Sequence, residues 1–246
     1  MELQIMPKRK VSFVIPVHNE AEILKKSLEE LNIFLQKANI DGEIIIAENG
    51  STDNTRKILK ELDFINIKKI FVKEKSFGLA LREGIKKASY DNIYFSGIDF
   101  PFGFENITNS LKYIDKYDIV FSSKTHPDSD VKRSIKRKVA SIVYDFILKR
   151  LLGLKINDPQ GTLMFDTKKI RELLPYCNSN DPFFTTQLAL YVQLNRLKYI
   201  EIPVKYYPRS DSKMSVVKDG SRMFKQIMGE RKKIKKIERK DLVGCK

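Results

Sequence analysis

The chain has 246 residues, a length that fits one large domain or two small ones. Its 46 Lys and Arg outnumber its 31 Asp and Glu, and the net charge of +15 suggests a polyanionic partner such as nucleic acid, an anionic membrane or a phosphorylated substrate. Two cysteines without a CxxC spacing argue against a disulfide framework and a zinc finger. No apolar run reaches the roughly 18 residues of a membrane span, and no signal-peptide pattern precedes the first apolar run.

The first half of the chain alternates between short apolar runs and segments with a helical period. The apolar runs predict strands over residues 11–16, 43–47, 67–72, 92–99 and 118–123. Helices are predicted from Asn19 to about Ala38, after a cap at Ser51 or Asp53, over residues 78–88 and over residues 104–113. This order predicts an α/β fold with a mostly parallel central sheet and helices on both faces.

The second half of the chain changes character. Residues 131–152 form a long helical pattern that opens with basic residues and turns apolar. Such a helix either lies at an interface or belongs to the core with a solvated first turn. Further elements are predicted as a strand near 161–165, a helix near 184–196, a strand over 199–207 and a helix from about Val217. We predict a single domain over residues 1–230 and a basic tail over residues 231–246 with a net charge of +6.

Polar residues follow several of the predicted parallel strands. Ligands of such sheets gather beyond the carboxyl ends of the strands. The polar residues at these ends lie in segments 16–20, 48–51 and 123–124 and at Asp99. A lone carboxylate in the position of Asp99 suits a metal or diphosphate site. We therefore expect these strand ends to form one polar site.

The short motifs at these ends also have structural explanations. Asn19 can cap the helix that follows it, and Gly50 can form a tight turn. Gly78 either lets backbone N–H groups approach an anion or permits close helix packing. The run from Arg209 to Lys213 suits phosphate recognition, but a solvated loop has the same composition.

Several well-known sites are missing from the sequence. No GxGxxG follows a strand and no GxxxxGK[ST] occurs, which argues against dinucleotide oxidoreductases and P-loop enzymes. There is no GxSxG motif of a hydrolase. The two histidines of the sequence, His18 and His126, do not form a metal-binding pattern.

The short motifs occur together and in order, and as a set they resemble family 2 glycosyltransferases with the GT-A fold. Within that family the chain looks most like the dolichyl-phosphate mannose and glucose synthases, over roughly residues 10–227. The matching segments are VSFVIPVHNEAE, AENGSTDNT, KSFGLALREGIKKA, NIYFSGIDF, DIVFSSK, RKVAS, DPQGTLMF, IEIPVKYYPR and DSKMSVVKDG. The resemblance implies inverting transfer of a hexose from a nucleotide-diphosphate sugar, GDP-mannose or UDP-glucose, to a polyprenyl (dolichyl) phosphate.

The resemblance also implies roles for individual residues. The residues expected to bind the nucleotide sugar are Pro16, His18, Glu20, Glu48 and Gly78. The residues expected to bind the acceptor phosphate are Lys124, Arg137, Ser141 and Ser212. Asp99 is expected to hold a metal on the diphosphate, and Arg209 and Lys213 to complete the catalytic site over the phosphates.

The sequence departs from the family pattern at the metal segment. The DxD motif appears here as Gly97-Ile98-Asp99, so one of the two expected carboxylates is missing. Magnesium needs only one or two protein carboxylates besides substrate phosphates and water, and we therefore expect a divalent cation, Mg or Mn. Lys124 stands where arginine is common, which replaces a bidentate contact with a point charge.

The acceptor implied by the resemblance is embedded in a membrane. We expect a cytoplasmic protein that is peripheral to the cytoplasmic face of the membrane and docks on anionic lipids. Two alternatives remain open: a family 2 transferase with a different acceptor, whose base would be Asp158 or Asp181, and a catalytically silent basic binding protein. Nucleic acid is the less favoured partner, because residues 231–246 contain no aromatic residue to stack on bases.

Overall fold

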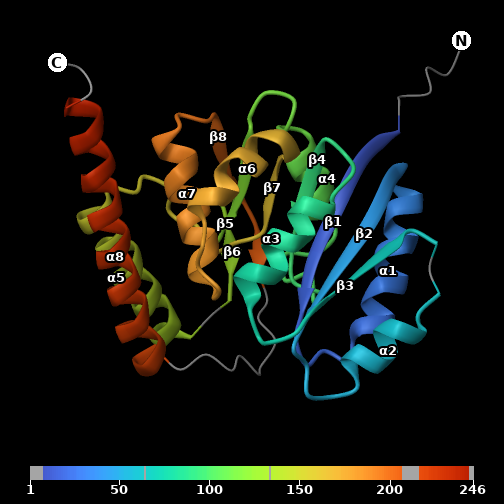
Figure 1. The fold of residues 1–246 in the computed structure, drawn as a ribbon. Helices are drawn as coiled ribbons and strands as arrows, with labels where there is room; N and C mark the ends of the chain where they lie inside the picture. Colours follow the sequence, from blue (N-terminus) through green and yellow to red (C-terminus); the bar gives the residue numbers. More distant parts are fainter. Residues whose placement is uncertain (1–7, 64, 133, 207–215, 244–246) are drawn as a thin grey trace, which may run out of the picture.

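A seven-stranded sheet lies at the centre of the molecule, with helices on both faces (Figure 1). The computed structural model describes residues 8–63, 65–132, 134–206 and 216–243. The strands, in spatial order, are β3 (Ile67–Val72), β2 (Ile40–Asn49), β1 (Arg9–Val17), β4 (Asn92–Phe95), β7 (Leu163–Asp166), β5 (Ile119–Ser123) and β8 (Tyr199–Pro203). Neighbours are parallel except at β7, which runs antiparallel to β4 and β5. The predicted α/β fold with a mostly parallel sheet is confirmed.

The central strands are apolar at most positions because both faces of the sheet are covered. Alternate residues of a strand point to opposite faces, so Val14 packs into one core and Phe13 and Ile15 into the other. The helices on the Phe13 side are α1 (Leu24–Lys37), α2 (Thr55–Glu61) and α4 (Glu105–Leu111). The helices on the Val14 side are α3 (Phe77–Lys87), α5 (Ile135–Leu152), α6 (Thr167–Leu173), α7 (Phe183–Leu194) and α8 (Val216–Val243).

The first helix begins later than the sequence predicts. α1 starts at Leu24, and its N-cap residue, Ile23, makes no side-chain cap hydrogen bond. Asn19 has a left-handed backbone conformation with φ of 57°. Its side-chain oxygen accepts a hydrogen bond from the Thr52 N–H at 2.8 Å. The prediction that Asn19 caps this helix is therefore wrong, because its side chain ties the end of β1 to the loop after β2.

Two strand ends also differ from the prediction. β2 continues through Glu48 and Asn49, so Glu48 lies within the strand. β4 ends at Phe95, and Asp99 therefore lies in a turn beyond the sheet. In this turn the Phe100 N–H donates a hydrogen bond to the Gly97 carbonyl oxygen at 3.1 Å. The turn takes the chain away from its strand neighbours before Asp99 is reached.

The second half of the chain contains three unpredicted features. β7 is inserted antiparallel between β4 and β5, so the loop that leads into β7 lies at the edge where the parallel strands end. α6 follows β7 directly, capped by Asp166, and continues into a short 3-10 turn, η1 (Leu174–Tyr176). The predicted strand over 199–207 is divided, because β9 (Lys205–Tyr206) leaves the main sheet to pair with β6 (Asp130–Val131).

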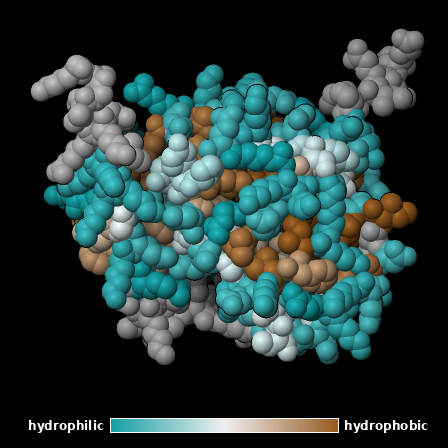
Figure 2. Space-filling model, in the orientation of Figure 1, coloured by the Kyte–Doolittle hydropathy of each residue, from teal (hydrophilic) through white to brown (hydrophobic). Residues whose placement is uncertain are grey.

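α5 and α8 lie side by side along one side of the molecule, and both start near the carboxyl-end edge of the sheet (Figure 1). α5 begins at Ile135, later than predicted, because Val131, where the predicted helix starts, belongs to β6. α8 continues through the expected boundary between residues 230 and 231. Hydrophilic side chains cover most of the face seen in this orientation (Figure 2). None of the helices within the described ranges combines the length and the apolar character that crossing a bilayer requires.

Candidate active site

Residues from four predicted motifs lie along one edge of the sheet. The strands β1, β2, β4 and β5 point the same way, so their carboxyl ends share this edge. In spatial order it carries Glu48 on β2, His18 after β1, Asp99 after β4 and Lys124 after β5. Neighbouring strands lie about 4.8 Å apart, so the row from β2 to β5 spans roughly 20 Å.

A buried carboxylate shapes the loop after β2. Glu48 is fully buried, and its Oε2 accepts a hydrogen bond from Arg56 Nε at 2.7 Å. Its Oε1 accepts a hydrogen bond from the Ser51 N–H at 2.5 Å. Arg56 also donates to the Val72 carbonyl at 3.2 Å. Both carboxylate oxygens of Glu48 thus have partners inside the protein, and a direct contact with the nucleotide stays a prediction. Arg56 was missed, because an arginine on a helix surface has no distinctive sequence pattern.

The end of β1 is tied to this same loop. His18 Nδ1 lies 3.0 Å from the Asn49 carbonyl oxygen, and since a carbonyl oxygen can only accept, Nδ1 donates this hydrogen bond. The Glu20 N–H donates to the Thr55 hydroxyl at 2.8 Å. Burial alone would raise the pKa of Asp53, but its hydrogen bonds with Thr55 outweigh burial and lower it. Asp53 is therefore charged at the start of α2, where the helix dipole favours a negative group.

Pro16 and Gly78 are both enclosed by the protein. Pro16 is buried within β1, in register with Ala47. The Gly78 N–H donates to the Asn180 carbonyl at 3.1 Å, and a Cβ at Gly78 would lie 2.0 Å from the Ser179 carbonyl oxygen. Of the two explanations for Gly78, this contact supports close packing. The role of both residues in nucleotide-sugar binding stays a prediction.

Asp99 is exposed in the turn after β4. A Cβ at Gly97 would lie 2.7 Å from Asp99 Oδ1, so the carboxylate occupies the space above the glycine. In the part of the chain that the structure describes, no group of three or more His, Cys, Asp or Glu side chains is arranged to hold a metal ion. A single exposed carboxylate fits a Mg or Mn ion that takes its other oxygen ligands from a diphosphate and water. It does not fit a metal held by the protein alone.

Lys124 lies at the other end of the edge, between one acid and two aromatic rings. Its Nζ lies 3.1 Å from Asp158 Oδ2, which also accepts the Lys124 N–H at 2.8 Å. The same Nζ lies 5.6 Å from the ring centre of Phe102 and 5.9 Å from that of Tyr206. The Lys124 side chain is 20% exposed. The ammonium is therefore held in place by cation–π and ionic contacts while part of the side chain remains accessible.

Asp158 reaches Lys124 from the loop that leads into β7. Gly161 lets this loop approach β5 closely, since a Cβ there would lie 2.3 Å from the Ser122 carbonyl oxygen. Asp158 was considered from the sequence only as a candidate base. Its pairing with Lys124 depends on the antiparallel insertion of β7, which no local pattern in the sequence indicated.

The second candidate base, Asp181, is engaged in packing contacts. Its Oδ1 accepts a hydrogen bond from the Phe183 N–H at 3.0 Å at the start of α7. Its Oδ2 lies 3.1 Å from Arg222 Nε of α8. Asp181 therefore joins α7 to α8, and Asp158 holds Lys124, which gives both carboxylates roles other than proton transfer.

The remaining predicted site residues belong to α5 and to the segment before α8. Ser141 lies in the second turn of α5 and is half-buried. Arg137 lies one turn earlier on the same helix. Arg209, Ser212 and Lys213 fall outside the described residues. The roles of these residues stay predictions.

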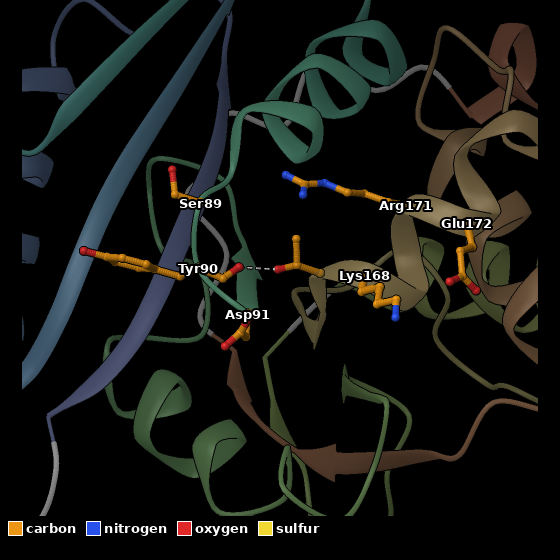
Figure 3. Close-up of a pocket in the computed structure, with 7 residues that line it drawn as sticks. Ser89, Tyr90, Asp91, Lys168, Arg171 and Glu172 are labelled. Atoms are coloured by element: carbon orange, nitrogen blue, oxygen red, sulfur yellow. Dashed lines mark hydrogen bonds between the residues drawn. The ribbon is translucent and has the colours of Figure 1, made fainter.

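A cavity of about 370 Å³ lies at the opposite edge of the sheet, away from these residues (Figure 3). It is next to the start of β4 and the end of β7, and its lining includes Tyr90, Thr167, Lys168 and Arg171. The Arg171 guanidinium points towards α3 and donates to the carbonyl oxygens at its end, with Nη2 at 2.5 Å from the Ala88 oxygen. Because Arg171 serves to hold α3, we locate the candidate site at the carboxyl-end edge.

Residues 12–174 match the family model of glycosyl transferase family 2. The chain belongs to this family. The matched segment runs from β1 through α6, and it includes the edge that carries Glu48, Asp99 and Lys124. The family expected from the short motifs is thus confirmed.

Two relatives of this family 2 member align with most of the chain. Glycosyltransferase AglD of Haloferax volcanii is 26% identical, and the match covers 89% of this chain and 36% of AglD. Dolichyl-phosphate beta-glucosyltransferase of Saccharomyces cerevisiae is 25% identical, and the match covers 89% of this chain and 73% of the yeast protein. The chain therefore spans only about a third of the length of AglD.

Solved structures of glycosyltransferases share the fold. Glucosyl-3-phosphoglycerate synthase of Mycobacterium tuberculosis, solved with Mn²⁺, UDP-glucose and phosphoglyceric acid, superposes with a TM-score of 0.60 at 18% identity. The superposition covers 91% of this chain and 79% of the mycobacterial one. This likeness confirms the expected GT-A fold.

Proposed function

We propose that this family 2 glycosyltransferase moves a hexose from a nucleotide-diphosphate sugar to a polyprenyl phosphate, with inversion at the anomeric carbon. The arrangement of Glu48, Asp99 and Lys124 along one sheet edge carries the proposal. We assign the nucleotide to the Glu48 side, the diphosphate to Asp99 and the acceptor phosphate to the Lys124 side. The name of the yeast relative supports glucose as the sugar and dolichyl phosphate as the acceptor.

The proposed reaction requires no general base. A phosphate monoester carries a charge of about −1.5 to −2 at pH 7, so its oxygen can attack directly. The bond between this oxygen and the anomeric carbon forms while the bond from that carbon to the diphosphate oxygen breaks. The electron pair of the broken bond leaves with the nucleoside diphosphate. The enzyme contributes positioning and charge stabilisation.

In the proposed reaction, cations stabilise the charges on the acceptor phosphate and on the leaving diphosphate. Lys124, positioned by Asp158, offers the acceptor phosphate a fixed positive charge. The further residues assigned to the phosphates are Arg137, Ser141, Arg209, Ser212 and Lys213. Asp99 would hold a divalent cation, Mg or Mn, which when bound stabilises the charge on the leaving diphosphate. The Mn²⁺ of the mycobacterial structure supports this choice of metal.

The lipid chain of the proposed acceptor is embedded in a bilayer, so the reaction would take place at the membrane surface. Basic residues near an anionic leaflet contribute about 1 kcal/mol each. The net charge of +6 over residues 231–246 could therefore contribute at most about 6 kcal/mol, less the cost of ordering these residues. We extend the proposal to a peripheral association with the cytoplasmic face of the membrane.

A thermal-shift panel of nucleotide sugars with and without Mg²⁺ or Mn²⁺ tests the donor. We expect UDP-glucose to raise the Tm in the presence of metal, and Asp99→Asn to remove the metal-dependent part of the shift. Transfer of labelled hexose to a polyprenyl phosphate tests the acceptor. A selective shift with GDP-mannose would reassign the sugar, and a full shift without metal would contradict the role of Asp99. Absence of transfer from every donor in the panel would contradict the proposed function.

A further inference from the structure

Five large apolar side chains of α5 face solvent. They are Ile135, Val139, Ile142, Val143 and Phe146, and each is between 51% and 81% exposed. Successive helix residues are rotated by about 100°, so these positions fall within an arc of about 100° on one face. We refer to these five residues as the apolar row of α5. A contiguous exposed apolar patch marks an interaction surface.

The opposite face of α5 already packs on the protein. Leu148 is 1% exposed and belongs to the core that α5 shares with α7. The Tyr144 hydroxyl lies 2.9 Å from the Thr186 hydroxyl of α7. A helix that is apolar on both sides is typical of burial between two apolar environments. The protein supplies one of them, and the apolar row indicates the other.

The two helices α5 and α8 are strongly basic in sequence. α5 and α8, which lie side by side (Figure 1), carry fifteen Lys and Arg and five Asp and Glu, which is +10 of the net charge of +15. Lys138, Lys149 and Arg150 of α5 are exposed. An apolar helix face bordered by cations is the pattern of a helix that lies in the interfacial layer of an anionic bilayer.

Two other partners fit the apolar row less well. Two copies of the chain that met through α5 and α8 would bring net charges of +10 face to face, and like charges oppose association. Nucleic acid is held by aromatic rings that stack on bases, whereas four of the five residues in the row are aliphatic. A surface of anionic lipids accommodates both the apolar side chains and the cations.

We propose that the apolar row of α5 inserts into the interfacial layer of an anionic membrane and docks the enzyme there. This inference rests on the proposed function, because a polyprenyl phosphate presents its phosphate at that layer. The row is about 17 Å long, and lysines at its border can reach the headgroups while the row is immersed. Ser141, a predicted acceptor ligand, lies on the same helix, which starts near the candidate active edge (Figure 1).

A tryptophan reporter tests which face meets the lipid, because the chain contains no tryptophan of its own. Phe146→Trp puts the reporter in the row, and Ile33→Trp puts it on α1, where Ile33 is 52% exposed. The vesicles contain equal parts of phosphatidylcholine and phosphatidylglycerol. We expect a blue shift and quenching by brominated acyl chains for Phe146→Trp, and neither for Ile33→Trp. Vesicle binding without quenching at position 146 would overturn the inference.

The same tryptophan reporter tests whether a second copy of the chain, rather than lipid, covers the apolar row. A blue shift of Phe146→Trp that grows with protein concentration in the absence of vesicles would show a second copy on the row, and would also overturn the inference. Sedimentation velocity of the wild type provides the matching measurement. We expect a species whose size does not change with concentration.

Affinity measurements separate this inference from the proposed function. Ile142→Gln/Phe146→Gln should weaken vesicle binding roughly tenfold or more, whereas Ile33→Gln should leave it unchanged. Transfer to a short-chain, water-soluble polyprenyl phosphate should survive in the double variant. If the wild type lacks that activity but its vesicle binding still requires the row, the proposed function fails and this inference stands. If the double variant binds vesicles like the wild type, this inference fails alone.

Discussion

The Lys124 ammonium lies 3.1 Å from a carboxylate oxygen of Asp158, although the two residues are 34 positions apart in the chain. Asp158 also accepts the backbone N–H of Lys124, so it holds both the main chain and the side chain of this residue. The Asp158 side chain is 9% exposed, and its carboxylate is therefore largely shielded from bulk water. A lysine held in this way presents its charge in one direction, which suits the positioning of a phosphate.

Asp158→Asn should lower the turnover number of the enzyme. The amide keeps the shape of the side chain but removes the negative charge that orients the Lys124 ammonium. Because small displacements of a positioning group are costly, we expect kcat to fall by about tenfold to a hundredfold, with little change in KM for the nucleotide sugar. Asp128→Asn is the control, since the Asp128 side chain is 81% exposed in the same region of the chain. Equal turnover in both variants would contradict the positioning role.

Glu48→Gln should destabilise the protein and weaken nucleotide-sugar binding together. The substitution leaves Arg56 without its buried carboxylate partner and weakens the bond to the Ser51 N–H. We expect the free energy of unfolding, measured in urea, to fall by about 2 kcal/mol. Glu83→Gln breaks only a surface pair with Lys86 and should change it by less than about 0.5 kcal/mol. Wild-type stability in Glu48→Gln would show that the loop does not depend on this pair.

Two glycine substitutions should change the free energy of unfolding in opposite directions. A Cβ at Gly78 would collide with the Ser179 carbonyl, and Gly78→Ala should lower the free energy of unfolding by about 1–3 kcal/mol. A Cβ at Gly229 of α8 meets no atom within 4 Å, and Gly229→Ala should raise it by about 0.5–1 kcal/mol. Urea unfolding measures both values. Normal stability of Gly78→Ala with lost nucleotide-sugar binding would instead favour approach of an anion to this glycine.

Glu43 should contribute to the acid sensitivity of the fold. Burial alone would raise the pKa of Glu43, but its contacts with Lys68, Ser12 and Ser89 outweigh burial and lower it below 4.5. The unfolded chain then binds the proton more tightly, so the contribution of Glu43 to stability is complete above its unfolded pKa and is lost as pH falls through the folded pKa. Glu43→Gln should lower the Tm at neutral pH and flatten its decline between about pH 5 and pH 3. Parallel Tm profiles of variant and wild type would contradict this assignment.

The sequence predicts the parallel half of the sheet well, because buried parallel strands are continuous apolar runs. The predicted bounds of β3 agree with the structure, and Gly50 adopts the positive φ, 66°, that its expected tight turn requires. The antiparallel direction of β7 could not be predicted, since a strand of four residues carries no sequence signal for its orientation. The start of α1 was misplaced because Asn19, a good cap residue, is used in a contact with Thr52 far along the chain.

Two kinds of feature could not be predicted from the sequence: ion pairs between distant residues, and the face of α5 that is exposed to solvent. The pairs Glu48–Arg56 and Lys124–Asp158 join different elements, and each partner alone has an ordinary sequence context. The helical pattern over 131–152 was compatible with both a core helix and an interfacial helix. The choice depends on which face the protein covers, and that is decided by the packing of α7 against only one side of α5.

The ladder between β4 and β7 joins two continuous stretches of the chain, one ending at Phe95 and the other beginning at Ile119. The first stretch contains the residues assigned to the nucleotide, and the second contains those assigned to the acceptor. The residues assigned to the two substrates therefore lie in separate stretches of the sequence. A chimaera that exchanges everything after β4 with a homologue should change the lipid that is modified while it keeps the choice of sugar.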